Sequence, residues 1–320
     1  MTRARPLPPA ARAIVSGDRR ALARVISQVE NREASAASVA RALYPRTGKK
    51  PVIGVTGPLG VGKSSVINRL VARLRDLDRT VGVVAVDPSS PYSGGSVLGD
   101  RIRFERRVDD AGVFFRSMAS RGEVGGIAAA TREVTRLLDA AGFDVILVET
   151  VGSGQVDLAV RDVATTSVVV LVPHLGDEVQ TLKAGLFEIA DVFCVNKADL
   201  PGADIARRDL AELVGLGGAR SGWRPRIVAT STTQPSGIEE LWSAIEAHEE
   251  FLDRTGARRA DERRRISAEI VELVRERVGR ELTRQLEREP ELRRWVDRAV
   301  ERTLDPHTVA DRLARALDSR

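Results

Sequence analysis

Residues 57–65 read GPLGVGKSS and match the pattern G-x-x-x-x-G-K-[ST]. In such a P-loop, backbone amides surround the phosphates, the lysine reaches the β- and γ-phosphates, and the hydroxyl binds Mg²⁺. The apolar run PVIGVT precedes the loop and the helical pattern SVINRLVARLRDL follows it, which is the context that the motif requires. We therefore predict a nucleoside triphosphate site with Mg²⁺ at Ser64. The predicted contacts are Gly57, Gly60, Val61, Gly62, Lys63, Ser64 and Ser65.

The tetrapeptide NKAD follows a later apolar run. Asn196 and Asp199 have the spacing with which guanine-nucleotide proteins read the base, because a carboxylate accepts from both the guanine ring nitrogen and the exocyclic amine. Lys197 would cover the ring plane. A turn or a helix cap is the ordinary alternative. After the next strand, the sequence TSTT lies where such proteins support the guanine carbonyl with backbone amides, which predicts contacts from Ser231 and Thr232.

Three acidic residues end or follow predicted strands. Asp87 ends TVGVVAVD, Asp100 follows a segment rich in Gly, Ser and Pro, and Glu149 ends VILVET. A magnesium–nucleotide site needs hard oxygen ligands beyond the P-loop hydroxyl, and a group that positions water. We predict metal ligands at Ser64, Asp87, Asp100 and Glu149, with Asp87 also positioning water and the Gly152 amide sensing the γ-phosphate. The alternatives are a turn acid, a helix cap and a strand end respectively.

Short apolar runs alternate with helical patterns from residue 51 to about 248. Nearly continuous apolar strands separated by helices favour a doubly wound α/β fold, with a mainly parallel sheet covered on both faces. Ligands of such sheets bind at the carboxyl ends of the strands. The expected strands lie in PVIGVTG, TVGVVAVD, GVFFRSM, DVILVET, SVVVLVP, DVFCVNKAD and PRIVATS.

Helical patterns flank this region on both sides. Residues 11–45 have helical periodicity, and beyond residue 257 apolar residues recur at helical spacing until Pro290 interrupts them. A last helix is expected to begin at Pro306 with Asp305 as its cap. We predict an N-terminal helical extension (1–50), a P-loop GTPase domain (51–250) and a C-terminal helical arm (251–320).

Composition excludes several classes of protein. The net charge is +5 and the pI about 9.8, but basic and acidic residues are interleaved and aromatic residues make up only 4%, which argues against nucleic acid binding. No apolar run approaches a membrane span. A single cysteine, Cys194, excludes an internal disulfide, suits the cytoplasm and is expected to be buried. The basic first dozen residues indicate a frayed terminus, with an organellar transit peptide as the alternative.

Several of these segments together resemble the MeaB family of G-protein chaperones for adenosylcobalamin-dependent acyl-CoA mutases. The resemblance runs from about residue 16 to 248, and the C-terminal tail matches in helical character only. The segments that carry it are GDRRALARVISQVENR, GPLGVGKSS, VAVDPSSPYSGGSVLGDRIRF, FFRSMASRGEVGG, VETVGSGQVD and GDEVQTLKAGLFEIADVFCVNKAD.

The resemblance implies a GTPase related to signal-recognition proteins that uses GTP/GDP and Mg²⁺, forms a homodimer through its C-terminal arm and has a mutase as partner. Its turnover would be slow and stimulated by the partner. It also implies switch segments at 87–100, after Glu149, and around 177–183. The switch candidates are Gln155, Asp177, Gln180 and Lys183. Thr232 stands where the family commonly has alanine, which weakens that one expectation.

Other interpretations of the same residues stay open. The alternative function is a P-loop kinase or transport-associated ATPase, against which NKAD argues. A metal-insertion GTPase would need a Cys/His cluster, and one cysteine with three dispersed histidines does not supply it. Lys183 could be a solvated helix lysine. Arg116 and Arg121 are candidates for phosphate or partner contacts, with surface salt bridges as the alternative.

Overall fold

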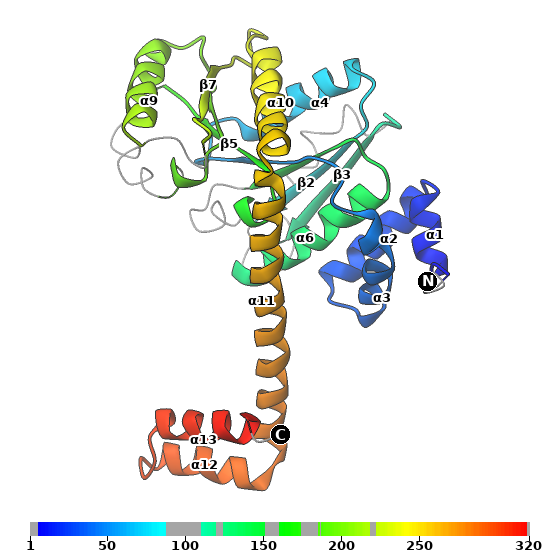
Figure 1. Cartoon of the computed structure of the whole chain (residues 1–320), viewed down its shortest axis with the longest axis vertical. Helices are drawn as coiled ribbons and strands as arrows, with labels where there is room; N and C mark the ends of the chain where they lie inside the picture. The colour runs from blue at the N-terminus through cyan, green and yellow to red at the C-terminus, as the bar shows by residue number, and fades with distance from the viewer. Residues whose placement is uncertain are drawn as a thin grey trace. The chain divides into compact units, whose positions relative to one another are not determined.

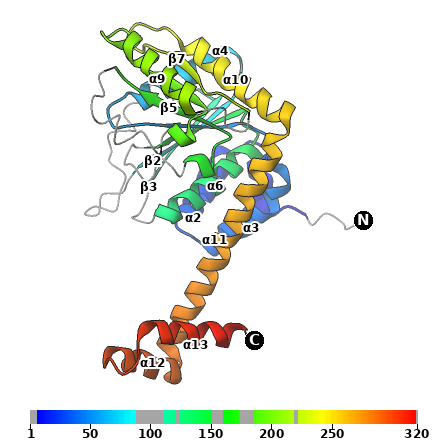
Figure 2. The ribbon, with the colours of Figure 1, turned by 60° about the vertical axis from the view of Figure 1, so that its left-hand side comes forward.

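The computed structural model describes residues 6–87, 110–119, 124–150, 160–173, 185, 187–217 and 222–318. The chain divides into two compact units, residues 1–260 and 261–320. The first unit contains a seven-stranded sheet with helices on both of its faces, as Figure 1 and the turned view of Figure 2 show.

All neighbouring strands of the sheet are parallel, in the order β3-β2-β4-β1-β5-β6-β7. Each of the seven runs expected from the sequence forms one of these strands, which confirms the doubly wound α/β fold. The strands are β1 (Val52–Thr56), β2 (Val81–Asp87), β3 (Val113–Ala119), β4 (Val145–Thr150), β5 (Thr166–Leu171), β6 (Val192–Val195) and β7 (Arg226–Ala229).

The two faces of the sheet bury separate sets of apolar side chains. Alternate residues of β4 point to opposite faces, so Leu147 packs with one set and Ile146 with the other. Helices α4 (Lys63–Asp76) and α10 (Ile238–Thr255) supply the Leu147 side. Helices α6 (Val124–Ala140) and α9 (Ala203–Gly217) supply the other. Because both faces are covered, most residues of the strands are apolar.

The N-terminal extension consists of α1 (Pro9–Val15), α2 (Arg19–Glu30) and α3 (Ala34–Leu43), and it packs beside α6 in Figure 1. The Asp18 side chain caps α2 by accepting from the amides of Arg20 and Ala21 at 2.9 and 3.0 Å. The apolar side of α2 buries Leu22, Val25, Ile26 and Val29.

Arg116 of β3 ties the extension to the sheet. Its Nε and Nη2 donate to the two Glu30 carboxylate oxygens at 2.9 and 2.5 Å, and Nη2 also donates to the Ser27 hydroxyl at 3.0 Å. The salt-bridge interpretation of Arg116 is therefore confirmed, because a two-pronged bond occupies the face of the guanidinium that a phosphate would use. Arg121 lies outside the described residues.

The C-terminal helices are α11 (Ala257–Arg288), α12 (Pro290–Val300) and α13 (Pro306–Asp318). The break at Pro290 and the cap at Asp305 are confirmed, since Asp305 Oδ1 accepts from the Thr308 amide at 3.0 Å. No side chain of α11 is buried. Among the residues that the structure describes, no helix is long and apolar enough to cross a bilayer. Large apolar side chains exposed on α11 are Ile270, Val271, Leu273, Val274 and Val278.

Candidate functional site

The P-loop follows β1, the strand at which the chain stops adding strands on one side of the sheet and begins to add them on the other. Strand β1 lies between β4 and β5, and the chain turns from the carboxyl end of β1 through the P-loop into α4. In the register of β1 with β4, Val55 pairs with Glu149. The predicted loop and the predicted carboxylate therefore leave adjacent strands side by side, where open α/β sheets bind their ligands.

Two P-loop glycines are required by close contacts. Gly57 has a φ of 137°, and a Cβ built on it would lie 2.2 Å from the Val170 carbonyl oxygen of β5. Gly62 caps α4 at a φ of 91°, and a Cβ there would lie 2.5 Å from Asn196 Nδ2. Any larger residue would push the loop away from the neighbouring strands. The glycines therefore keep the loop amides at the amino end of α4, which favours anion binding.

Lys63 is buried inside the loop with only 6% of its surface exposed. Its Nζ donates to the carbonyl oxygens of Gly57 and Pro58 at 2.7 and 2.8 Å. These contacts hold the ammonium over the cradle formed by the backbone. Phosphate oxygens carry a negative charge and so accept such hydrogen bonds more strongly than carbonyl oxygens do. The lysine is thus placed to exchange these bonds for phosphate contacts.

Ser64 and Glu149 meet at the first turn of α4. The Ser64 hydroxyl donates to Glu149 Oε1 at 2.5 Å, and Glu149 is buried with 7% exposed. A hydroxyl and a carboxylate at this separation are a pair of hard oxygen donors of the kind Mg²⁺ prefers. Below them, the Thr150 hydroxyl donates to the Thr56 hydroxyl at 2.8 Å and links the ends of the two strands. The residue types fit the predicted metal.

The tetrapeptide NKAD, which was predicted to read the base, contacts the P-loop directly. Asn196, which is fully buried, donates from Nδ2 to the Val61 carbonyl oxygen at 2.8 Å. Lys197 has a φ of 57° and donates from Nζ to the Gly60 carbonyl oxygen at 3.0 Å. Hydrogen bonds thus join residues that are more than 130 positions apart in sequence. The tetrapeptide also forms the turn given as the alternative, since the Leu200 amide donates to the Lys197 carbonyl oxygen at 3.0 Å.

Asp199, the last residue of the tetrapeptide, is exposed and can accept hydrogen bonds. The Ser231 hydroxyl donates to its Oδ1 at 2.5 Å, and this hydrogen bond lowers the pKa of the carboxyl, so Asp199 is ionised near neutral pH. Thr232 lies in the same loop, where its carbonyl oxygen accepts from Arg69 Nη2 at 2.8 Å. The sequence predicted backbone contacts from this loop, but it did not indicate that the Ser231 side chain orients Asp199.

Several predicted residues cannot be placed. The backbone of Asp87 ends β2 next to β4, in agreement with its predicted position, but the structure does not describe its side chain. The following lie outside the described residues: Asp100, Gly152, Gln155, Asp177, Gln180 and Lys183.

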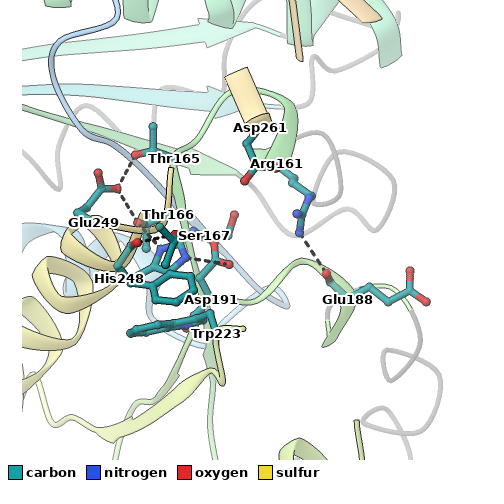
Figure 3. Close-up of polar contacts among 12 residues, drawn as sticks. Arg161, Thr165, Thr166, Ser167, Glu188, Asp191, Trp223, His248, Glu249 and Asp261 are labelled. Atoms are coloured by element: carbon teal, nitrogen blue, oxygen red, sulfur yellow. Dashed lines mark hydrogen bonds and ion pairs between the residues drawn. The ribbon is translucent and has the colours of Figure 1, made fainter. Parts of the chain in front are cut away.

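A second polar cluster lies at the opposite, amino edge of the sheet (Figure 3). His248 Nδ1 lies 2.8 Å from the Thr166 hydroxyl, and Nε2 lies 3.5 Å from Asp191 Oδ1. The acid, imidazole and hydroxyl resemble a nucleophilic triad. However, Thr166 is fully buried and His248 is 3% exposed. The Thr166 hydroxyl also donates to Glu249 at 2.6 Å. A nucleophile needs access to substrate, so we interpret this cluster as structural.

Known proteins resemble this chain over nearly its whole length. The family model described as "Methylmalonyl Co-A mutase-associated GTPase MeaB" matches residues 22–287. A Pyrococcus abyssi protein named as a GTPase is 45% identical over 304 residues, 94% of each chain. The Mus musculus protein "Methylmalonic aciduria type A homolog, mitochondrial" is 31% identical over 96% of this chain and 78% of its own. A crystal structure of "LAO/AO transport system kinase" has a TM-score of 0.69 and 27% identity, covering 97% of this chain and 96% of its own.

Proposed function

The chain belongs to the MeaB family of P-loop GTPases, and from this membership we propose that it is a GTP-dependent chaperone of an adenosylcobalamin-dependent acyl-CoA mutase. The family description names methylmalonyl-CoA mutase, and the mouse relative is named for methylmalonic aciduria. In the proposed cycle, bound GTP orders the switch segments against the mutase and hydrolysis releases them.

The observation that carries the nucleotide assignment is the joining of NKAD to the P-loop. Lys197 and Asn196 each donate to a P-loop carbonyl oxygen, and Asp199 beside them is an ionised, exposed acceptor. We propose that Asp199 accepts from the guanine ring nitrogen and amine. Adenine lacks that pair of donors, and a site built to hydrogen-bond particular groups of its ligand discriminates against an analogue that lacks them.

We assign the magnesium site to the Ser64 hydroxyl and, directly or through a water molecule, to Glu149. Their 2.5 Å contact supports the assignment, and Asp87 and Asp100 are proposed as further ligands from the sequence. Mg²⁺ would supply positive charge to the β- and γ-phosphates. Lys63 would hold the same phosphates from the P-loop side, and Asp87 would position water.

Stimulation of GTP hydrolysis by a purified methylmalonyl-CoA mutase tests the partner. We expect slow turnover alone and a several-fold increase with the mutase, and we expect Lys183→Ala to keep the basal rate but lose the increase. Arg254→Ala is a matched control outside the proposed switch. No stimulation of the wild type by this mutase or by other cobalamin mutases would refute the chaperone role. Equal stimulation of wild type and Lys183→Ala would refute only the switch assignment.

Nucleotide choice separates this function from a P-loop kinase or transport-associated ATPase. We expect GTP to bind at least about 100-fold more tightly than ATP. Asp199→Asn should reverse the polarity at the base, because an amide can donate to the 2-oxo group of xanthine. That variant should therefore prefer xanthosine over guanosine diphosphate. A preference of the wild type for ATP would favour the alternative.

The C-terminal arm is proposed to form a homodimer. Its support is the row of apolar side chains on α11 that the described chain leaves exposed, among them Ile270, Val274 and Val278 at helical spacing. Light scattering should give twice the 34.7 kDa chain mass for the wild type and the single mass for Val274→Glu. A monomeric wild type would refute the dimer and would leave the nucleotide site untouched.

A further inference from the structure

Beneath the base-reading segment, three buried polar side chains form a chain of hydrogen bonds that ends on the P-loop. Cys194 of β6 lies with Sγ 3.2 Å from the hydroxyl oxygen of Thr230, the residue after β7. That hydroxyl lies 3.2 Å from Asn196 Oδ1. Cys194, Thr230 and Asn196 are all fully buried. Because water has no access to these side chains, they must find their hydrogen-bond partners within the protein.

The direction of each hydrogen bond follows from which atoms can donate. The Val61 carbonyl oxygen is only an acceptor, so the Asn196 amide must present its NH₂ there, at 2.8 Å. This orientation turns Oδ1 toward Thr230. Oδ1 is again only an acceptor, so Thr230 donates its single hydroxyl proton to it. The Thr230 oxygen is then left as an acceptor, and the Cys194 thiol is the donor in the remaining contact.

The thiol is suited to this donor position. Burial raises the pKa of Cys194 to about 12, although the Thr230 hydrogen bond opposes the shift. Cys194 therefore keeps its proton throughout the physiological range. The backbone fixes the other members, since the Thr230 amide donates to the Val195 carbonyl oxygen at 2.8 Å and the Asn196 amide donates to Leu171 at 2.8 Å. Only the side-chain torsions remain to be set.

We propose that Thr230 is a positioning residue for guanine-nucleotide binding, which fixes the Asn196 amide in the orientation that holds the P-loop, with Cys194 supporting it. The contact is tight, because a Cβ on Gly62 would lie 2.5 Å from Asn196 Nδ2. Rotation of the amide by 180° would place two oxygens against each other at Val61. At the other end, the Thr230 hydroxyl would have to accept from the amide NH₂ and exchange the strong acceptor Oδ1 for the weakly accepting Cys194 sulfur.

This inference rests on the proposed guanine site, and its test is built on Thr230→Val, which keeps the side-chain shape but removes the hydroxyl. We expect the dissociation constant for GDP, measured by calorimetry, to rise about tenfold, as the loss of one buried hydrogen bond predicts. Thr230→Ser keeps the hydroxyl and should stay within about twofold of the wild type. Cys194→Ala, at the far end of the chain, should raise the dissociation constant about two- to threefold.

A double-mutant cycle separates positioning from general damage. If Thr230 acts through Asn196, then Thr230→Val should add almost nothing to the loss of GDP affinity in an Asn196→Ala background. Multiplied losses in the double variant, or equal losses in Thr230→Val and Thr230→Ser, would overturn the proposal. If Asn196→Ala alone leaves GDP affinity unchanged, the base-site assignment itself is wrong. Should Asn196→Ala not fold, Asn196→Asp takes its place, because its carboxylate still accepts from Thr230 but cannot donate to Val61.

Discussion

At the carboxyl edge of the sheet, Lys63 and Lys197 donate to backbone carbonyl oxygens of the P-loop. At the amino edge, Lys50 donates to the Asp144 carboxylate at 3.0 Å, and Thr80 donates to the same carboxylate from its amide and its hydroxyl. Both edges therefore hold lysines and acids in fixed positions. At the carboxyl edge the partners of the lysines include carbonyl oxygens of the glycine-rich loop, and at the amino edge the partner is a carboxylate that also accepts from strand-end donors.

The comparison extends to one acid at each edge: Glu149 is buried, and Glu249 is partly buried. Glu149 at the carboxyl edge faces the Ser64 hydroxyl at the start of α4. Glu249 at the amino edge accepts from two hydroxyls, including Thr166, and pairs with Arg258 at 2.9 Å. Figure 3 shows His248 and Glu249, which belong to α10, beside Thr165 and Thr166 at the amino end of β5. The two clusters thus differ in their partners: Glu149 faces the start of α4 beside the P-loop, where we propose that phosphate and metal bind, and Glu249 is held by an arginine and two hydroxyls.

The largest expected effect comes from replacing one lysine of each edge, Lys63 or Lys50, with an uncharged side chain of similar length. Lys63→Met should lower GTP hydrolysis by at least about 100-fold, because it removes the positive charge at the transferring phosphate. Lys50→Met should leave hydrolysis within about twofold and change only stability. Steady-state phosphate release measures both. Equal losses in the two variants would break the comparison between the edges.

A smaller effect, on the magnesium dependence of hydrolysis, is expected for Glu149 at the carboxyl edge of the sheet. Glu149→Gln should raise the Mg²⁺ concentration needed for half-maximal hydrolysis about tenfold, since groups that ligate or orient ligands of a metal affect its affinity to this degree. Titration with Mg²⁺ at saturating GTP is the measurement. Asp144→Asn, from the amino edge, is the matched control and should keep the wild-type magnesium dependence. An unchanged curve for Glu149→Gln would remove Glu149 from the metal site.

The smallest effect is on stability at the amino edge. Burial opposes ionisation of Asp144, but the Thr80 amide, Lys50 and the Thr80 hydroxyl outweigh it and lower the pKa from 3.8 to about 2. A lowered folded-state pKa stabilises the protein above the unfolded-state pKa, and this contribution is lost as the pH falls from about 4 toward 2. Because the carboxylate is partly exposed, Asp144→Asn should cost about 1 to 2 kcal/mol at pH 7.

Urea unfolding of both proteins between pH 7 and the lowest pH at which they stay folded checks this result. The difference in the free energy of unfolding should be constant above about pH 5 and shrink below pH 4. A difference that grows on acidification would mean that the sign of the Asp144 effect is wrong.

The sequence was sufficient where one local pattern dictates one local structure. All seven strands were indicated by apolar runs, because a parallel sheet covered on both faces needs apolar residues at most positions of its strands. The Asp305 cap and the break at Pro290 were predicted for the same kind of reason. The P-loop was predictable because phosphate binding confines its glycines, lysine and hydroxyl to one short segment.

Contacts between distant segments were not available from these patterns. Nothing local marks Thr230 as a partner of Asn196, or Ser231 as a partner of Asp199, since serine and threonine are ordinary residues after a strand. Arg116 illustrates the opposite case, a residue proposed for phosphate or partner contacts that pairs with Glu30 of the extension. The domain boundaries at 50 and 250 and the switch residues stay predictions.

The sequence by itself indicated the parts of this protein: the strands, the P-loop, the NKAD tetrapeptide and the family to which they belong. Only the tertiary structure decided which polar residues act together, because strand order and register set the neighbours of each side chain. That arrangement placed Glu149 against Ser64 and the Asn196 amide against Val61. It also separated the edge with the P-loop from a second polar cluster, in which Thr166 and His248 are buried.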